Sequence, residues 1–156
     1  FDFAFPNLEG DTISMSDKRF ENKNIVLQIF GSWCPNCMDE TALYADLHKK
    51  YGKNTEFVGI AFERKGELEK DKAILEKYIK HFDLQYPILY GGKASKKLAS
   101  EKFPMLNKII SFPTTIVVDK ERNVVKIHTG FNGPATSVYK EYLKEFENLL
   151  EELSKS

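Results

Sequence analysis

The chain has 156 residues, of which 42% are hydrophobic and 13% aromatic, a composition that indicates a globular protein and excludes a disordered one. Its length fits a single domain covering residues 1–156. The 23 basic and 23 acidic side chains give zero formal net charge, which argues against a nucleic-acid partner bound through bulk charge. No apolar run approaches the roughly 20 residues needed to span a bilayer. Because the sequence begins at Phe1 instead of methionine, we expect a processed piece from which any signal peptide or membrane anchor has been removed.

The first thirty residues predict a hairpin followed by a buried strand. Residues 1–5 and 12–16 alternate between apolar and polar side chains on either side of Gly10, which is typical of a short β-hairpin. Residues 16–20 are expected to form one helical turn. Residues 25–30 are almost wholly apolar, which predicts a central parallel strand buried on both faces.

The only two cysteines, Cys34 and Cys37, lie between that strand and an amphipathic run, residues 38–51, that predicts a helix. One helical turn brings residues i and i+3 within the Cα separation of about 7 Å that a disulfide requires. The unpaired N–H groups and the positive dipole end of a helix start favour a thiolate at the first cysteine. Because the thiolate is the attacking species in thiol–disulfide exchange, we expect Cys34 to be the more exposed and more acidic thiol.

Two other interpretations of the pair stay open. A structural zinc site usually needs four ligands, but only one cysteine pair is present, and His48, His81 and His128 are scattered along the chain. A purely structural disulfide is the second alternative, although closing so short a loop removes little chain entropy. A Cys-x-x-Cys beside a strand-then-helix pattern favours redox chemistry.

One acidic residue lies on the predicted inner face of the helix over residues 38–51. That face contains residues spaced three or four apart: Cys37, Glu40, Leu43, Tyr44, Leu47 and Tyr51. Burying a carboxylate is costly unless it is paired or protonated. We therefore expect Glu40 to be buried near Cys37, with a pKa above the ordinary value of roughly 4.3.

The rest of the chain alternates strands and helices, which predicts an α/β fold. Residues 57–62 predict a second buried parallel strand, residues 63–72 a solvated charged segment, and residues 86–90 a short strand that ends in a turn at 91–92. Residues 94–102 predict a helix, and residues 114–119 and 124–129 an antiparallel hairpin. The two remaining helices are predicted from apolar stripes, namely Ile74, Leu75, Tyr78, Ile79 and Phe82 for one, and Val138, Tyr142, Phe146, Leu149 and Leu153 for the other.

This order of elements and motifs resembles the thioredoxin superfamily, and more closely its TlpA/ResA-like extracytoplasmic branch. The resemblance covers nearly the whole chain and rests on residues 5–10, Gly31-Ser32-Trp33-Cys34, Glu40 and Phe112-Pro113-Thr114-Thr115. It implies a thioredoxin-like fold, with a central mixed sheet flanked by helices, an N-terminal β-hairpin and a central helix–strand insertion near residues 66–90.

The resemblance also implies roles for individual residues. Cys34 would be the attacking thiol, Cys37 the resolving thiol, and Glu40 a group that exchanges a proton with Cys37. Pro113 matches the family's cis-proline, so the Phe112–Pro113 bond is expected to be cis, with the Phe112 backbone pairing with a substrate segment. The other implied substrate-binding residues, which shape the rim, are Trp33, Pro35 and Asn36.

Three features of the sequence depart from the pattern of the superfamily. Gln28 stands where ordinary thioredoxin has a buried aspartate, and an amide cannot take a proton. The dipeptide Pro35-Asn36 differs from the usual pairs, so the family's redox potential cannot be carried over. Phe112 is bulkier than usual and is expected to narrow the substrate groove.

By this resemblance the chain is expected to be an enzyme, a thiol–disulfide oxidoreductase that reduces protein disulfides without a metal or cofactor. The expected location is the periplasm or the outward face of a bacterial membrane. The protein is expected to act as a monomer on protein thiols and disulfides, and to receive electrons from a membrane donor. Cytochrome c biogenesis is one process in which it is expected to take part. A thiol peroxidase is an alternative, because residues 5–11 also resemble peroxiredoxins, although Gly31 stands where those have threonine. A redox-inert adaptor domain of a larger surface protein is another.

Overall fold

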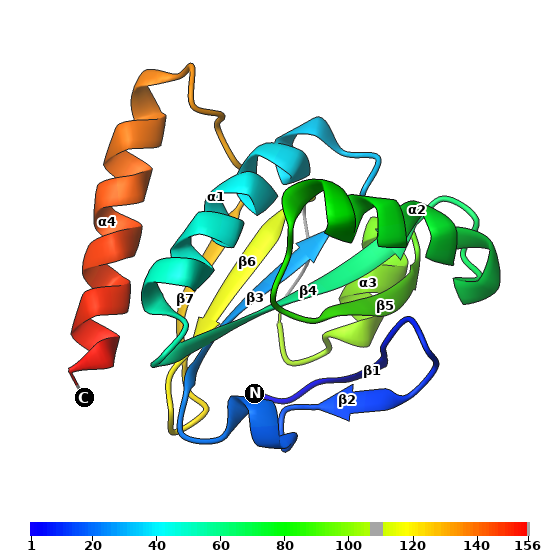
Figure 1. Cartoon of the computed structure of the whole chain (residues 1–156), viewed down its shortest axis with the longest axis horizontal. Coiled ribbons are helices and arrows are strands. Elements are labelled where there is room, and N and C mark those ends of the chain that lie inside the picture. The colour runs from blue at the N-terminus through cyan, green and yellow to red at the C-terminus, as the bar shows by residue number, and fades with distance from the viewer. Residues whose placement is uncertain (107–110, 156) are drawn as a thin grey trace.

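A five-stranded mixed sheet forms the centre of the computed structural model, which describes residues 1–106 and 111–155 (Figure 1). The strand order is β5-β4-β3-β6-β7. Parallel pairing joins β3 to β4 and β4 to β5, whereas β6 is antiparallel to both β3 and β7. The strands are β3 (Asn24–Phe30), β4 (Thr55–Glu63), β5 (Ile88–Lys93), β6 (Thr114–Val118) and β7 (Val124–Thr129).

Both central strands are buried along their whole length. All seven residues of β3 and all nine of β4 are buried, as expected for strands covered on both faces. Side chains of β3 alternate between two apolar clusters, so Val26 and Phe30 lie on one face and Leu27 and Ile29 on the other. The predicted strands over residues 25–30 and 57–62 are therefore confirmed, and Gln28 lies on the face of Val26.

Helices cover the two faces unequally. Side chains of α1 (Pro35–Tyr51), α2 (Leu68–Phe82) and α4 (Ser137–Ser154) contribute to the cluster on the Val26 face. The short helix α3 (Lys96–Lys102) and the N-terminal hairpin of β1 (Ala4–Pro6) and β2 (Thr12–Ser14) contribute to the other. The predicted hairpin and the single helical turn after it, a 3₁₀ turn at Lys18–Phe20, are both confirmed.

Local sequence explains where α1 begins and ends. The Cys34 side chain accepts a hydrogen bond from the Cys37 N–H, as an N-cap residue does, and Pro35 occupies the first turn, where its missing N–H costs nothing. Gly52 follows the last turn, and its N–H donates to the carbonyl of His48. Every residue of the predicted inner face of this helix is buried.

The charged segment over residues 63–72 was predicted to be solvated, and this is wrong at two positions. The exposed fractions of Glu63 and Asp71 are only 2% and 1%, because donors reach both carboxylates. The helix also begins earlier, so residues 68–72 are part of α2. Its predicted stripe is wrong at Ile74, which is 51% exposed.

Two further predictions need correction. Gly91 and Gly92 do not form a turn but lie within β5, where the register against β4 shifts after Ala61. A bulge of this kind suits glycine, and Gly92 has a φ of +129°. On α4, Val138 is 45% exposed, whereas Phe146 and Leu150 are fully buried.

Both described ends of the chain lie on the side of the molecule where β3 starts (Figure 1). The Phe1 ammonium donates to the carbonyl of Arg122, and the Arg122 guanidinium donates to the carbonyls of Phe20 and Lys23, just before β3. The Asn24 amide donates to the carbonyl of Leu153, near the end of α4. The opposite end of β3 leads into the two cysteines.

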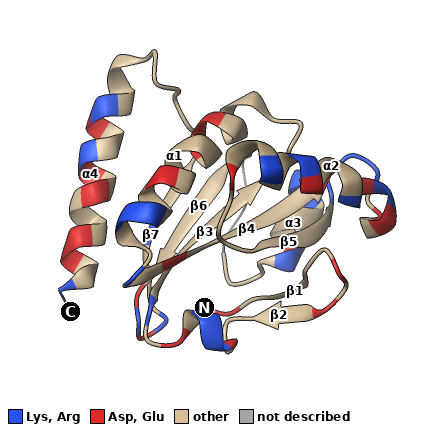
Figure 2. Ribbon diagram, in the orientation of Figure 1, with Lys and Arg blue, Asp and Glu red and all other residues tan. Residues whose placement is uncertain are grey.

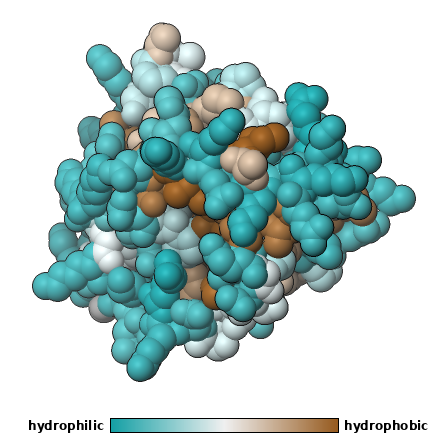
Figure 3. Space-filling model, turned by 45° about the vertical axis from the view of Figure 1, so that its right-hand side comes forward, coloured by the Kyte–Doolittle hydropathy of each residue, from teal (hydrophilic) through white to brown (hydrophobic). Residues whose placement is uncertain are grey.

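The surface is polar and mixed in charge. Basic and acidic residues are interspersed along α2 and the first half of α4, whereas acidic residues predominate in the second half of α4 (Figure 2). In the view of Figure 3, hydrophilic side chains dominate and apolar ones show between them in narrow bands. Among the described residues, no helix has the length and apolarity required to cross a membrane.

Candidate active site

The two cysteines lie where β3 gives way to α1. Both are free thiols, and Cys34 is 6% exposed whereas Cys37 is fully buried. The Cys37 N–H donates to Cys34 Sγ at 3.2 Å. This N–H and the positive end of the α1 dipole both stabilise negative charge on the Cys34 sulfur. The structure thus gives the predicted order of exposure, although Cys34 is itself mostly covered.

The loop before β6 closes over Cys34. The Phe112–Pro113 peptide bond is cis, as predicted. The carbonyl oxygen of Phe112 lies 3.8 Å from Cys34 Sγ. The carbonyl oxygen of Pro113 accepts a hydrogen bond from the N–H of Gly130 at 2.7 Å. The predicted substrate-binding residue Phe112 is therefore directly beside the more exposed sulfur.

Aromatic side chains form one wall of the site. Trp33 donates its indole N–H to the carbonyl of Phe62 at 2.8 Å, and its ring meets that of Phe112 edge-on at 5.5 Å. The Arg64 guanidinium lies 5.7 Å from the Trp33 ring centre, a cation–π contact. The structure therefore brings together Trp33, Phe112, Pro113 and Cys34, whereas Pro35 and Asn36 are exposed on the first turn of α1.

The indole of Trp33 occupies the space beside the backbone of Gly31. A Cβ atom on Gly31 would collide with that indole ring. A threonine, which peroxiredoxins have at this position, would therefore require Trp33 to move. The packing of this loop favours the dithiol interpretation over the thiol-peroxidase alternative.

Glu40 lies one helical turn beyond Cys37 and is fully buried. Its Oε1 accepts hydrogen bonds from Gln28 Nε2 at 3.1 Å and from Thr115 Oγ1 at 3.0 Å. Its Oε2 has no hydrogen-bond partner among the described residues. Burial raises the pKa of Glu40 to about 8, although the bonds from Thr115 and Gln28 oppose that shift. The predicted burial and raised pKa are both confirmed.

The Cys37 thiol is held neutral by the same burial. Desolvation is the largest cause that raises the pKa of Cys37 well above its ordinary value, and the charge of Glu40 acts in the same direction. Cys37 can attack only after it loses a proton. A carboxyl that titrates near neutral pH, one turn away, is chemically suited to accept that proton.

Sequence reasoning missed Glu63, the last residue of β4. Its carboxylate accepts hydrogen bonds from the Ser32 N–H at 2.8 Å and from the Ser32 hydroxyl, so it ties down the loop in front of Cys34. Burial raises the pKa of Glu63. The available signal was its position directly after the apolar strand, where a carboxylate with no local partner is unusual.

A hydroxyl network around Glu40 was also missed. Its inner members are buried and come from three elements: Tyr44 and Thr41 of α1, Tyr78 of α2 and Thr115 of β6. Among the described residues, no three or more His, Cys, Asp or Glu side chains are grouped to bind a metal ion. His48 instead pairs with Glu56 at 2.8 Å.

A dithiol at the start of α1, facing the cis-proline loop before β6, defines a thioredoxin-fold protein of thiol–disulfide exchange. Residues 1–127 match the model of the AhpC/TSA family, and the chain belongs to this family.

Named relatives narrow the class. The chain is 27% identical to the thiol-disulfide oxidoreductase ResA of Bacillus thuringiensis over 146 residues, which cover 92% of this chain and 73% of that protein. It is 26% identical to the thioredoxin-like protein YneN of Bacillus subtilis over 129 residues, covering 83% and 68% of the two chains. A thiol-disulfide oxidoreductase structure from Bacteroides fragilis shares the fold, with a TM-score of 0.67, 23% identity and coverage of 94% and 97%. Thiol–disulfide oxidoreduction is the enzyme class of this chain.

Proposed function

We propose that the protein reduces disulfide bonds of other proteins, with Cys34 as the attacking thiol and Cys37 as the resolving thiol. The geometry at Cys34 carries this proposal. Its sulfur is the more exposed of the two, accepts the Cys37 N–H at 3.2 Å and lies 3.8 Å from the carbonyl oxygen of Phe112.

The first step is attack by the Cys34 thiolate on one sulfur of the substrate disulfide. A Cys34–substrate disulfide forms, the substrate S–S bond breaks, and the other substrate sulfur leaves as a thiolate that takes a proton from solvent. An extended substrate segment would pair with the backbone of Phe112, and the Trp33 and Phe112 rings would flank it. Pro35 and Asn36, exposed on the first turn, complete the rim.

The second step releases the reduced substrate. Glu40 accepts the Cys37 proton, and the Cys37 sulfur attacks Cys34 Sγ, so that the Cys34–Cys37 bond forms and the Cys34–substrate bond breaks. The substrate sulfur leaves as a thiolate and takes a proton from solvent. The substrate has then gained two electrons, and the dithiol has lost two. A dithiol electron donor at the membrane returns them by the reverse exchange.

The proposed setting is the periplasm or the outward face of a bacterial membrane. Protein disulfides form and persist in such oxidising compartments, so a reductant of protein disulfides finds its substrates there. We propose that residues 1–156 form one domain and that the protein acts as a monomer. The resemblance to ResA-like proteins supports this setting and makes cytochrome c biogenesis one process to test.

Trapping with Cys37→Ser tests the proposal. This variant can form the mixed disulfide but cannot resolve it, so substrate proteins should stay attached until a reductant is added. Cys34→Ser is the matched control and should trap nothing. The wild type should reduce insulin with turnover, and equal turnover by Cys34→Ser would contradict the assignment. Peroxide consumption faster than insulin reduction would support the peroxidase instead, and no turnover with either substrate would support the adaptor.

A further inference from the structure

A row of hydroxyl groups leads away from Glu40. Thr115 Oγ1 lies 3.0 Å from Glu40 Oε1, the Tyr44 hydroxyl lies 2.8 Å from Thr115 Oγ1, and the Tyr142 hydroxyl lies 2.9 Å from that of Tyr44. These residues belong to β6, α1 and α4. Thr115 and Tyr44 are each 1% exposed, whereas Tyr142 is half-buried. The row therefore runs from the buried carboxyl toward the surface.

The direction of each hydrogen bond follows from a count of protons. Every hydroxyl has one proton to donate and lone pairs to accept with. When Glu40 is ionised, Thr115 donates its proton to the carboxylate, so Tyr44 must donate to Thr115. Tyr44 then has no proton left, so Tyr142 must donate to Tyr44. All three donors point inward, which is the arrangement that suits an ionised Glu40.

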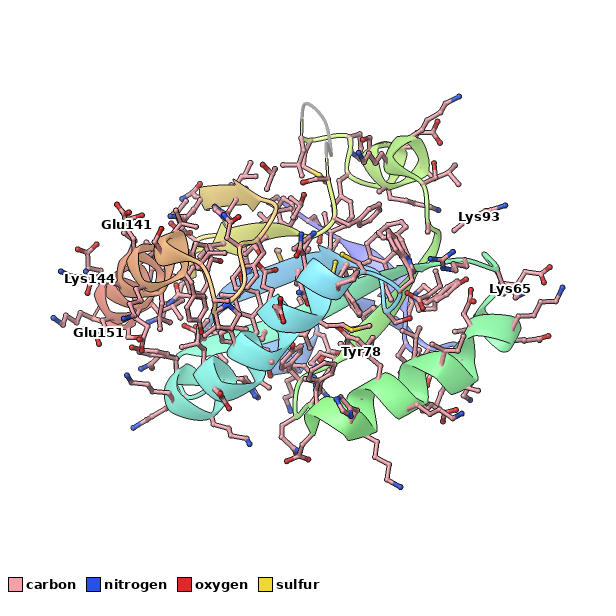
Figure 4. The ribbon with its side chains drawn as sticks, turned by 90° about the horizontal axis from the view of Figure 1, so that it is seen from above. Lys65, Tyr78, Lys93, Glu141, Lys144 and Glu151 are labelled. Atoms are coloured by element: carbon pink, nitrogen blue, oxygen red, sulfur yellow. The ribbon has the colours of Figure 1, made fainter. Side chains whose placement is uncertain are left out.

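The outer end of the row reaches a hollow in the surface between β7 and α4. The hollow has a volume of about 190 Å³ and is lined by Lys126, His128, Asn132, Val138, Glu141, Tyr142 and Glu145. The His128 ring lies 4.6 Å from the Tyr142 ring, centre to centre. Figure 4 shows Glu141, the neighbour of Tyr142, on the outer side of α4. Because Tyr142 lines the hollow, a proton that leaves its hydroxyl would be delivered to water there.

We propose that Thr115, Tyr44 and Tyr142 form a proton relay between Glu40 and solvent. The inference rests on the proposed role of Glu40 as the base for Cys37. Once Glu40 has taken the Cys37 proton, the three hydroxyls turn outward, so that Glu40 donates to Thr115, Thr115 to Tyr44 and Tyr44 to Tyr142. Glu40 then passes one proton to Thr115 as Thr115 gives its own to Tyr44, Tyr44 to Tyr142, and Tyr142 to water. Each hydroxyl ends neutral with its bond reversed, so one proton leaves and no charge stays buried.

The second branch of the network cannot do this. Gln28 donates from Nε2 to Glu40 and accepts at Oε1 from Thr41, whose hydroxyl accepts from Tyr78 at 2.8 Å. To pass on a proton, the amide of Gln28 would have to convert to its unstable imidic-acid tautomer, so proton transfer along this branch stops at Gln28. Tyr78 lies between α1 and α2 (Figure 4), and it provides a matched buried hydroxyl in the same network but off the relay.

Among the ionisable groups at the inner end of the relay, Glu40 is the one that titrates near neutral pH. It is faced by Cys37 and Tyr44 of α1, by Tyr142 of α4 and by Tyr86 before β5. Burial raises the pKa of each of these above its ordinary value, so all stay neutral between pH 5 and 9. At the outer end, burial lowers the pKa of His128, the group beside Tyr142.

Single-turnover reaction of the reduced protein with oxidised glutathione tests the relay, because attack by Cys34 and resolution by Cys37 appear as separate phases. Trp33, the only tryptophan, reports both by its fluorescence. Tyr142→Phe should slow the resolution phase on the order of tenfold while the attack phase is unchanged. Tyr78→Phe should leave both phases at the wild-type rate. Thr115→Val should behave like Tyr142→Phe, and Thr115→Ser should restore the rate.

Solvent deuterium separates a relay from a merely structural role. The resolution rate of the wild type should fall along a curve as the deuterium fraction rises, because several hydrogens move together, whereas Tyr142→Phe should give a shallow straight line. Wild-type rates and curvature in Tyr142→Phe and Thr115→Val, while Glu40→Gln is slow, would overturn the relay alone. Equal slowing by Tyr78→Phe would also overturn it. A wild-type rate in Glu40→Gln would instead overturn the role of Glu40.

Discussion

At the scale of single residues, Glu40 combines two properties that seldom occur together: it is completely buried, and one of its oxygens has no partner among the described residues. The raised pKa of Glu40 makes the stability of the fold depend on pH. The folded protein holds the proton up to about pH 8, whereas the unfolded chain releases it near 4.5. The unfolded state therefore binds fewer protons between these values, and stability falls as pH rises through that window.

Glu40→Gln should remove this dependence, because an amide of the same shape does not titrate. Its free energy of unfolding should change little between pH 5 and pH 8, whereas that of the wild type should decrease. Urea unfolding followed by circular dichroism at the two pH values measures both. If the free energy of unfolding fell equally in the wild type and the variant between pH 5 and pH 8, another group would have to titrate in this range. The variant should also slow disulfide exchange on the order of a hundredfold.

At the scale of elements, the end of β4 supports the loop that begins the site. Glu63→Leu leaves the buried Ser32 N–H and hydroxyl without an acceptor, so it should destabilise the protein by about 1–3 kcal/mol. Glu63→Gln is the control, because its amide oxygen can still accept from Ser32. Urea unfolding gives both values, and equal loss in the two variants would show that charge, not hydrogen bonding, matters at this position.

Helix α4 packs on the core through the predicted stripe, except that Val138 is exposed and Leu150 is buried in addition. Phe146 is fully buried and stacks against Tyr44 and Tyr142, with ring centres 5.4 and 5.6 Å apart. Phe146→Ala should therefore cost about 3–5 kcal/mol. Val138→Ala, on the exposed first turn, should change stability by less than about 0.5 kcal/mol. Thermal unfolding would contradict the packing of α4 if both substitutions had similar effects.

At the scale of the whole molecule, local features of the site could be predicted from sequence and distant ones could not. The positions of Cys34, Cys37 and Glu40 follow from helical spacing alone, so the burial of Glu40 was predictable. The partners of Glu40 were not, because Thr115 is 75 residues away along the chain. Glu63 was assigned to a solvated face since nothing near it in sequence suggests that Ser32, 31 residues earlier, donates to it.

Glycine patterns failed for a related reason. Gly91-Gly92 is a turn signal when only neighbours along the chain are considered. In the sheet, a Cβ on Gly91 would press into the Phe62 ring of β4, so glycine is required by packing across the strands. The prediction that Val138 of α4 is buried was wrong because periodicity indicates which face of a helix is apolar but not at which turn the helix begins to contact the core.

Both chain ends lie on the side of the molecule where β3 starts, and this determines where the enzyme can be attached to other objects. The dithiol follows the other end of this seven-residue strand, roughly 20 Å away. A fluorescent protein, an affinity tag or a bead fixed at either end would therefore lie at the end of the molecule opposite the two cysteines. Insulin reduction by such fusions should stay within about twofold of the untagged rate, whereas the same tag inserted at Gly133, whose backbone lies beside Asp39 of α1, should obstruct it. An enzyme immobilised on a surface through either chain end would therefore have its two cysteines facing the solution.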